Sequence, residues 1–199
     1  MSDIKSDSKK SDLKKSGIFA KKHIIFYGVL FALIVVFSNF AVQFQIANTY
    51  LTYGALTYPF SFLMLDILSE KNSKEQVLKV LKIGIILAFI PSLFLSQPAI
   101  AIASVCAFII SQNIDVHLFF FFKNKVPKLW WLRNNASTII AQFFDTMIFF
   151  NIAFFGVKSV SECVLMALLD FSIKIILSVM NTPFFYLLAV RMKHRIWNL

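Results

Sequence analysis

The sequence is short of glycine and cysteine, and long stretches of it carry no charge. Only 5 of its 199 residues are glycines and only 2 are cysteines, which lack the spacing of metal ligands and suggest no disulfide framework. No Asp, Glu, Lys or Arg occurs between Lys22 and Asp66, a gap of 43 residues, or between Lys82 and Asp115, a gap of 32. A soluble domain of this size has too little interior to bury such runs, so the soluble globular classes are excluded.

Common catalytic motifs are also missing. The chain has no GxxxxGK[ST] phosphate loop, no HExxH zinc motif and no GxSxG nucleophile elbow. It therefore has no Walker site with which to hydrolyse ATP, and we expect neither an enzyme nor a bound cofactor. An intramembrane hydrolase that uses Asp115 and Asp145 stays an alternative, on the weak basis of two aspartates in separate apolar segments.

What the sequence has in abundance is apolar length. It is 58% hydrophobic, with 24 phenylalanines and a mean hydropathy of +0.74. A membrane-spanning helix needs about 20 apolar residues, so the first uncharged gap holds two spans and the second holds most of another two. We predict an all-α, polytopic membrane protein with six transmembrane helices, over residues 24–42, 50–69, 77–95, 99–122, 135–156 and 163–190.

The basic residues predict the orientation of these spans. Of the 20 lysines and arginines, 18 fall on the same side of the predicted membrane as the N-terminus, while Lys158 alone falls on the other side and Lys174 lies within the sixth span. Basic loops stay in the cytoplasm, so both termini are predicted to be cytoplasmic. The net charge of +10 is thereby explained without nucleic acid as a partner. The predicted domains are a disordered lysine-rich tail over 1–22, a six-helix transmembrane domain over 23–190 and a basic tail over 191–199.

Five ionisable residues remain within or near the predicted spans. A charge at the centre of a membrane helix costs about 2.5–3.5 kcal/mol to insert, so each such residue is expected to face protein or a watery cavity. Asp145 and Lys174 lie at similar depths near the middle of the membrane, and we predict that they can meet there. Asp115 and Asp66 lie nearer the cytoplasmic side, and Asp170 lies one turn from Lys174.

Polar residues recur along one face of three predicted spans. The spacing of i, i+4, i+8 and i+11 places four side chains on a single helical face. Since lipid cannot satisfy polar groups, the three stripes are expected to face a shared interior. The stripes are Asn134, Thr138, Gln142 and Asp145 in the fifth span, Asp170, Lys174, Ser178 and Asn181 in the sixth, and Ser104, Ser111 and Asp115, with Gln112 beside them, in the fourth.

Simpler interpretations of these charges stay open. Asp170 and Lys174 are four residues apart and can pair along one helix. Asp66 can pair with Lys71 or reach the membrane interface. Asp145 can serve only as a polar contact between helices.

Aromatic rings beside amide and carboxylate groups suit a flat heterocycle, because rings stack on its faces while polar groups bond its edge. Tyr58, Pro59 and Phe60 interrupt the second span at such a place, and Pro59 frees a backbone carbonyl that can face a cavity. Asn39 and Gln43, at the end of the first span, are either interface residues or part of the same interior.

Several blocks of the sequence resemble the queuosine precursor transporter family, also called the vitamin-uptake-like transporters. They occur in the same order as in the family and cover roughly residues 38 to 190, which is almost all of the predicted membrane region. The blocks are SNFAVQ (38–43), GALTYPFSFLMLDILSE (54–70), SQNIDVHLFFF (111–121), WWLRNNASTIIAQFFDTMIFF (130–150) and LLDFSIKIILS (168–178).

The resemblance implies import of 7-cyano-7-deazaguanine or a related 7-deazaguanine across the bacterial inner membrane, for salvage into tRNA queuosine. It implies a 7-deazaguanine and the lipid bilayer as partners. A coupling ion (a proton or sodium gradient), facilitated diffusion followed by intracellular trapping, and a partner ATPase module all stay open as the source of energy. Transport of another purine-like base or vitamin, or a non-transporting membrane scaffold, stays an alternative. The substrate-binding positions that the resemblance implies are Asn39, Gln43, Asp66, Gln112, Asp115, Asn135, Gln142, Asp145, Asp170 and Lys174.

Overall fold

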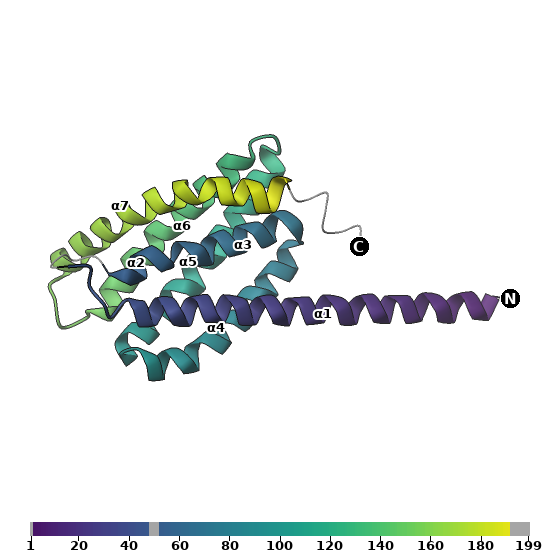
Figure 1. The fold of residues 1–199 in the computed structure, drawn as a ribbon, viewed down its shortest axis with the longest axis horizontal. Coiled ribbons are helices and arrows are strands. Elements are labelled where there is room, and N and C mark those ends of the chain that lie inside the picture. Colours follow the sequence, from purple (N-terminus) through teal and green to yellow (C-terminus); the bar gives the residue numbers. More distant parts are fainter. Residues whose placement is uncertain (1, 48–51, 192–199) are drawn as a thin grey trace.

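The computed structural model describes residues 2–47 and 52–191, with side chains from residue 22 onward, and confirms the all-α fold class. Figure 1 shows a bundle in which the N-terminal end of α1 and the C-terminal end of α7 lie at the same end. The helices are α1 (Ser2–Ala41), α2 (Tyr53–Thr57), α3 (Pro59–Lys71), α4 (Lys74–Leu95), α5 (Pro98–Lys125), α6 (Trp130–Ala153) and α7 (Val160–Phe185), which continues into the π-helical turn η1 (Tyr186–Val190).

Local sequence explains where these helices begin. Ser73 and Ser159 each cap a helix: the serine oxygen accepts from a backbone N–H three residues on, and the side chain of Gln76 or Glu162 accepts from the serine backbone. Prolines begin α3 and α5, because a first-turn residue needs no N–H donor. The turns between the predicted spans therefore lie where the sequence indicated.

Five helices in the described part of the chain are long and apolar enough to cross a membrane: Lys22–Ala41, Lys74–Leu95, Pro98–Lys125, Trp130–Ala153 and Val160–Val190. They match five of the six predicted spans. The span predicted over 50–69 is divided instead into α2 and α3, since Pro59 cannot donate the backbone hydrogen bond that would continue α2. Neither piece is long enough by itself to be counted as a crossing.

The structure describes the two predicted tails only in part. The backbone of α1 is helical from Ser2, whereas a disordered tail was predicted over 1–22; the apolar part of α1 begins at Lys22. Of the predicted C-terminal tail over 191–199, residues 192–199 lie outside the described residues. The domain boundaries stay predictions.

The backbones of α1 and α4 approach each other closely. A methyl group added at Gly84 of α4 would lie 2.4 Å from the Phe31 ring of α1, and one at Gly28 of α1 would lie 2.8 Å from the Ile83 side chain. Small residues at helix contacts permit such packing inside membranes. Phe31 is completely buried at this contact.

The distribution of side chains is that of a membrane protein. Large apolar side chains such as Phe94 and Phe155 are 84% and 88% exposed, which in a membrane places them against lipid. The interior in turn buries many polar side chains, including Gln112, Gln142 and Asp115, all at 0% exposure. The predicted polar stripes therefore do face a common interior, since lipid cannot satisfy their hydrogen bonds.

Candidate functional site

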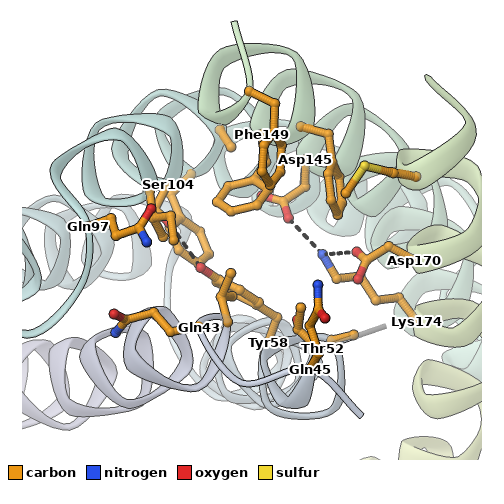
Figure 2. Close-up of a pocket in the computed structure, with 18 residues that line it drawn as sticks. Gln43, Gln45, Thr52, Tyr58, Gln97, Ser104, Asp145, Phe149, Asp170 and Lys174 are labelled. Carbon is orange, nitrogen blue, oxygen red and sulfur yellow. Dashed lines mark hydrogen bonds and ion pairs between the residues drawn. The ribbon is translucent and has the colours of Figure 1, made fainter. Parts of the chain in front are cut away.

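A cavity of about 310 Å³ lies at the end of the bundle opposite the N-terminal end of α1. The segment that follows α1, the short helix α2, the first turns of α5, the last turns of α6 and the first half of α7 line it. Aromatic and aliphatic side chains make up part of its wall. Its polar lining residues are Gln43, Gln45, Thr52, Tyr58, Gln97, Ser104, Asp145, Asp170 and Lys174 (Figure 2).

A buried ion cluster forms one wall of this cavity. The Nζ atom of Lys174 lies 2.9 Å from Asp170 Oδ2, one turn earlier on α7, and 3.3 Å from Asp145 Oδ2 on α6. Ser111 of α5 donates a hydrogen bond of 2.9 Å to Asp145 Oδ1. The predicted meeting of Asp145 and Lys174 is confirmed, and it exists together with the pair along one helix. Two carboxylates against one ammonium give the ionised cluster a net charge of −1.

Tyr58 places an aromatic ring beside the ion cluster, at the break between α2 and α3. Lys174 Nζ lies 4.9 Å from the centroid of this ring, close enough for a cation–π contact. The Tyr58 hydroxyl donates to Asn39 Oδ1 and lies 2.9 Å from Ser104 Oγ. Asn39 donates in turn to Ser92 Oγ at 2.9 Å. Hydrogen bonds to α1 and α5 therefore hold the ring in place.

Beyond the cavity, polar stripes continue to pair between helices. Gln142 of α6 accepts a 3.0 Å hydrogen bond from the Ser178 hydroxyl of α7. Gln112 of α5 donates a 3.2 Å hydrogen bond to the Ser61 hydroxyl of α3. None of these four residues lines the cavity. They support the residues that do.

A second cluster of carboxyl groups lies farther along α3 and α5. Asp66 and Asp115 are 1% and 0% exposed. The Thr138 hydroxyl of α6 lies 3.0 Å from Asp66 Oδ2 and 3.5 Å from Asp115 Oδ1. Asp66 forms no ion pair with Lys71, which was one of the open interpretations.

At the opposite end of the bundle from the cavity, a third charged group joins α3, α5 and α6. Arg133 Nη2 lies 3.0 Å from both carboxylate oxygens of Glu70, and Arg133 Nη1 donates to the Pro127 carbonyl at 2.8 Å. Lys123 donates to the Ser69 and Glu70 carbonyls at 2.7 and 2.9 Å, near the C-terminal end of α3, where a cation is favoured. Glu70 and Arg133 are each 6% exposed.

The structure places the predicted substrate-binding residues at three kinds of position. Four of them line the cavity: Gln43, Asp145, Asp170 and Lys174. Asn39 does not line it but accepts a hydrogen bond from Tyr58, which does. Four others are buried in the bundle without lining the cavity. These are Asp66, Gln112, Asp115 and Gln142.

The structure does not bring Asn135 to the cavity. Its side chain donates to the Trp131 carbonyl at 2.9 Å and accepts from the Thr182 hydroxyl at 3.0 Å. It lies one residue from Asn134, which begins the polar stripe, and successive residues on a helix are turned by about 100°. Asn135 therefore points away from the stripe that leads to Asp145.

Several cavity residues were not among the predicted binding positions. Tyr58 had a signal in the sequence, since it directly precedes the proline that breaks the second span. Ser104 belonged to a predicted stripe, and Phe149 follows Asp145 by one turn on α6. Gln97 lies between helices and gave no signal of its own. No group of three or more His, Cys, Asp or Glu placed to hold a metal ion occurs among the residues that the structure describes.

Comparisons with known proteins agree with these observations. Residues 90–188 match the family model described as "Putative vitamin uptake transporter". The chain is 29% identical over 160 residues to the "Probable queuosine precursor transporter" of Bacillus subtilis, covering 68% of this chain and 70% of the relative. It is 27% identical over 183 residues to the "Queuosine precursor transporter" of Escherichia coli, covering 79% and 82%.

A third relative, the "Probable queuosine precursor transporter" of Haemophilus influenzae, is 29% identical over 126 residues, which cover 52% of each chain. No solved structure matches the chain. The names of the relatives support a transporter role. The predicted family resemblance is thus confirmed: the chain is a multi-pass membrane protein similar to the queuosine precursor transporters, and its residues 90–188 match the vitamin uptake transporter model.

Proposed function

We propose that the protein imports a 7-deazaguanine precursor of queuosine, such as 7-cyano-7-deazaguanine, across the bacterial inner membrane for tRNA salvage. The observation that carries the proposal is the cluster of Asp145, Lys174 and Asp170 beside the Tyr58 ring on the cavity wall. The names of the three relatives support the choice of substrate. The transported molecule undergoes no chemical change in this proposal.

The polar groups of the cavity complement the edge of a 7-deazaguanine. Its amino group and ring N–H groups are donors, which suit the carboxylates of Asp145 and Asp170, and its carbonyl is an acceptor, which suits Lys174. The cavity volume of about 310 Å³ lies at the small end of the range of about 300–1,000 Å³ for small-molecule sites. A small bicyclic base therefore suits the cavity.

The aromatic lining supplies apolar surface for the faces of such a base. The Tyr58 ring lies 6.3 Å from the Phe149 ring, and Phe149 lies 5.3 Å from Phe150, so three rings adjoin one region of the cavity. Their planes are inclined to one another, at 59° and 89°. Such rings can contact the base on its face or edge, which adds affinity beyond the hydrogen bonds.

We also propose that the chain crosses the membrane six times, with both termini in the cytoplasm. The supporting observation is that α2 and α3, which come between α1 and α4 in the chain, follow one another across the bundle. Together they extend from Tyr53 to Lys71, close to the length of about 20 residues that a span needs. The described N-terminal and C-terminal ends lie at the same end of the bundle, which an even number of crossings requires.

In this orientation the cavity is on the outer side of the membrane. The cytoplasmic side is then the end where Arg133 pairs with Glu70, and where Phe119, Phe185 and Ala189 are completely buried together. This arrangement corresponds to an outward-facing state of an alternating-access transporter. Opening the other side requires the pair of Glu70 and Arg133 to separate.

Uptake of radiolabelled 7-cyano-7-deazaguanine in a bacterial strain unable to synthesise it tests the proposal. We expect uptake with the wild-type protein and none above background with Asp145→Asn. Competition by unlabelled guanine, adenine and riboflavin distinguishes a queuosine precursor transporter from one for another purine-like base or vitamin. Uptake that does not depend on the protein would reject the proposal, and normal uptake by Asp145→Asn with altered assembly would favour a scaffold role for that residue.

A further inference from the structure

Asp66 and Asp115 form a pair of buried carboxyl groups that the substrate cavity does not use. They come from different helices, α3 and α5, and neither lines the cavity. The Thr138 hydroxyl lies 3.0 Å from Asp66 Oδ2 and 3.5 Å from Asp115 Oδ1, so one hydroxyl group contacts both side chains. Both residues are at most 1% exposed. The pair is thus closed off from bulk water in this state.

None of the cations that the structure describes balances this pair. Within the part of the chain that the structure describes, neither Asp66 nor Asp115 makes an ion pair. The nearby charge on α3 is the like charge of Glu70, which Arg133 of α6 already pairs. Toward the cavity, Asp145 and Asp170 are occupied with Lys174, so the cations of the bundle interior are engaged elsewhere.

Oxygen atoms of the pair and of its neighbour are left free to accept a proton or a hydrogen bond. Asp66 Oδ1 and Asp115 Oδ2 are buried without a hydrogen-bond partner, and so is the Oε1 atom of Gln112, one turn before Asp115 on α5. Two buried carboxylates that share a neighbour and have no cation favour the binding of a proton, as paired carboxyl groups in other proteins show. A proton neutralises one of the two charges.

The carboxyl pair is connected to the substrate cluster by two helices. Ser111, which donates to Asp145, lies one turn before Asp115 on α5. Thr138, which touches the carboxyl pair, lies two turns before Asp145 on α6. A change in the protonation of the pair therefore acts on the same two helices that position the Asp145 carboxylate.

We propose that Asp66 and Asp115 form a proton-binding site, separate from the substrate cavity, that couples import to the proton gradient. This inference rests on the proposed transport function. In the coupled step a proton that enters from outside binds a carboxylate of the pair and is released to the cytoplasm when that side opens. Protonation removes the uncompensated charge, which lets α3, α5 and α6 move relative to one another.

Purified protein in liposomes tests the proposal with radiolabelled 7-cyano-7-deazaguanine as the probe. We expect an inward proton gradient to raise initial uptake by at least about fivefold, within the usual range of coupling between two sites, and an inward sodium gradient to have no effect. Exchange of labelled for unlabelled probe without any gradient reports transport alone. No exchange by the wild-type protein would count against the proposed function, whereas exchange without stimulation by protons would overturn only the coupling site.

Variants of Asp66 and Asp115 test whether these two residues cause the stimulation of uptake by protons. Asp66→Asn and Asp115→Asn imitate the protonated side chain, so we expect each to lose the stimulation by protons, measured relative to its own exchange without a gradient. Glu75→Gln, which removes an exposed carboxylate on α4, should keep the wild-type exchange and the stimulation by protons. Stimulation that survives in both aspartate variants, or stimulation by sodium in place of protons, would overturn the proposal.

A second measurement does not require transport. In the infrared spectrum of the purified protein, we expect the band of a protonated carboxylic acid to titrate with pH in the wild type. This band should be missing in the double variant Asp66→Asn with Asp115→Asn and present in Glu75→Gln. An unchanged band in the double variant would show that the proton lies elsewhere, and would contradict the assignment even if the single variants were too unstable to reconstitute.

Discussion

The two ends of the bundle contain similar chemistry in different surroundings. At the cavity end, Lys174 of α7 pairs with Asp145 of α6 at 3.3 Å; at the other end, Arg133 of α6 pairs with Glu70 of α3 at 3.0 Å. Each pair is buried and joins two helices. The first borders a cavity of about 310 Å³, whereas Phe119 and other completely buried apolar side chains lie near the second.

The comparison shows that the space beside an ion pair determines what the pair can do. Beside the cavity, Lys174 and its carboxylates can exchange some of their contacts with each other for contacts with a bound molecule. At the packed end the only available change is separation of the partners, which moves the helices apart. We therefore propose that the first pair binds the substrate and that the second pair holds the cytoplasmic end closed.

The largest effect is expected from Lys174→Met. It leaves Asp145 and Asp170 buried without their cation, and removing one partner of a buried pair costs about 3–5 kcal/mol. We expect loss of uptake and a lower unfolding temperature of the purified protein. Lys79→Met, at an exposed position of α4, should change neither.

A double variant separates folding from binding at this cluster. Lys174→Met together with Asp170→Asn keeps the net charge of −1 of the ionised cluster. We expect it to recover much of the unfolding temperature but none of the uptake, because no ammonium remains for the substrate carbonyl. Uptake at the wild-type rate by either variant would exclude a binding role for Lys174.

A smaller effect is expected from Arg133→Met at the packed end. It removes an ion pair with Glu70 and a charge-assisted hydrogen bond worth about 1.5–3 kcal/mol, and so favours separation of α3 from α6. With both native cysteines replaced by alanine, Gln97→Cys at the cavity can report the outward-facing state through its labelling by a membrane-impermeant maleimide. We expect Arg133→Met to slow this labelling, whereas the exposed Arg191→Met should not. Faster labelling would show that the pair does not hold the cytoplasmic end closed.

A still smaller effect is expected at Tyr58, where two variants distinguish the role of the hydroxyl group from that of the ring. Tyr58→Phe loses the hydrogen bonds to Asn39 and Ser104, and a net cost of about 0.5–1.5 kcal/mol corresponds to a rise in the KM of uptake of about two- to tenfold. Tyr58→Leu also loses the ring beside Lys174 and should raise the KM further. Equal KM values for the two variants would mean that the ring does not contact the substrate.

The smallest effect is expected from Asn135→Ala, which tests a position that the family resemblance implied. Asn135 forms its hydrogen bonds with Trp131 and Thr182, away from the cavity. We therefore expect uptake to change by no more than about twofold. This corresponds to the free-energy change of about 0.5 kcal/mol that is usual for substitutions outside a core or a binding site. Gln142→Ala, on the stripe, should reduce uptake more, because it leaves the Ser178 hydroxyl without its acceptor. The reverse order would restore Asn135 as a binding residue.

Much of the fold was predictable because its signals are local. Apolar runs predicted five of the helices, capping serines and prolines marked their ends, and Pro59 marked the break in the second predicted span. The spacing of Asp145 and Lys174 along their helices also placed them at matching depth. Asn135 shows the limit of such arguments, since a shift of one residue turns a side chain by about 100°.

The sequence by itself determined that the chain forms membrane helices and that polar stripes run along three of them, because hydrophobicity and helical period are properties of consecutive residues. Only the tertiary structure decided which stripes meet. It set Lys174 between two carboxylates and left Asp66 and Asp115 without a cation, although all four aspartates look alike in the sequence. The reason is that charge compensation inside a membrane depends on contacts between helices. One such contact joins Thr138 to Asp66, which lie 72 residues apart in the sequence. A single sequence contains no direct record of such contacts.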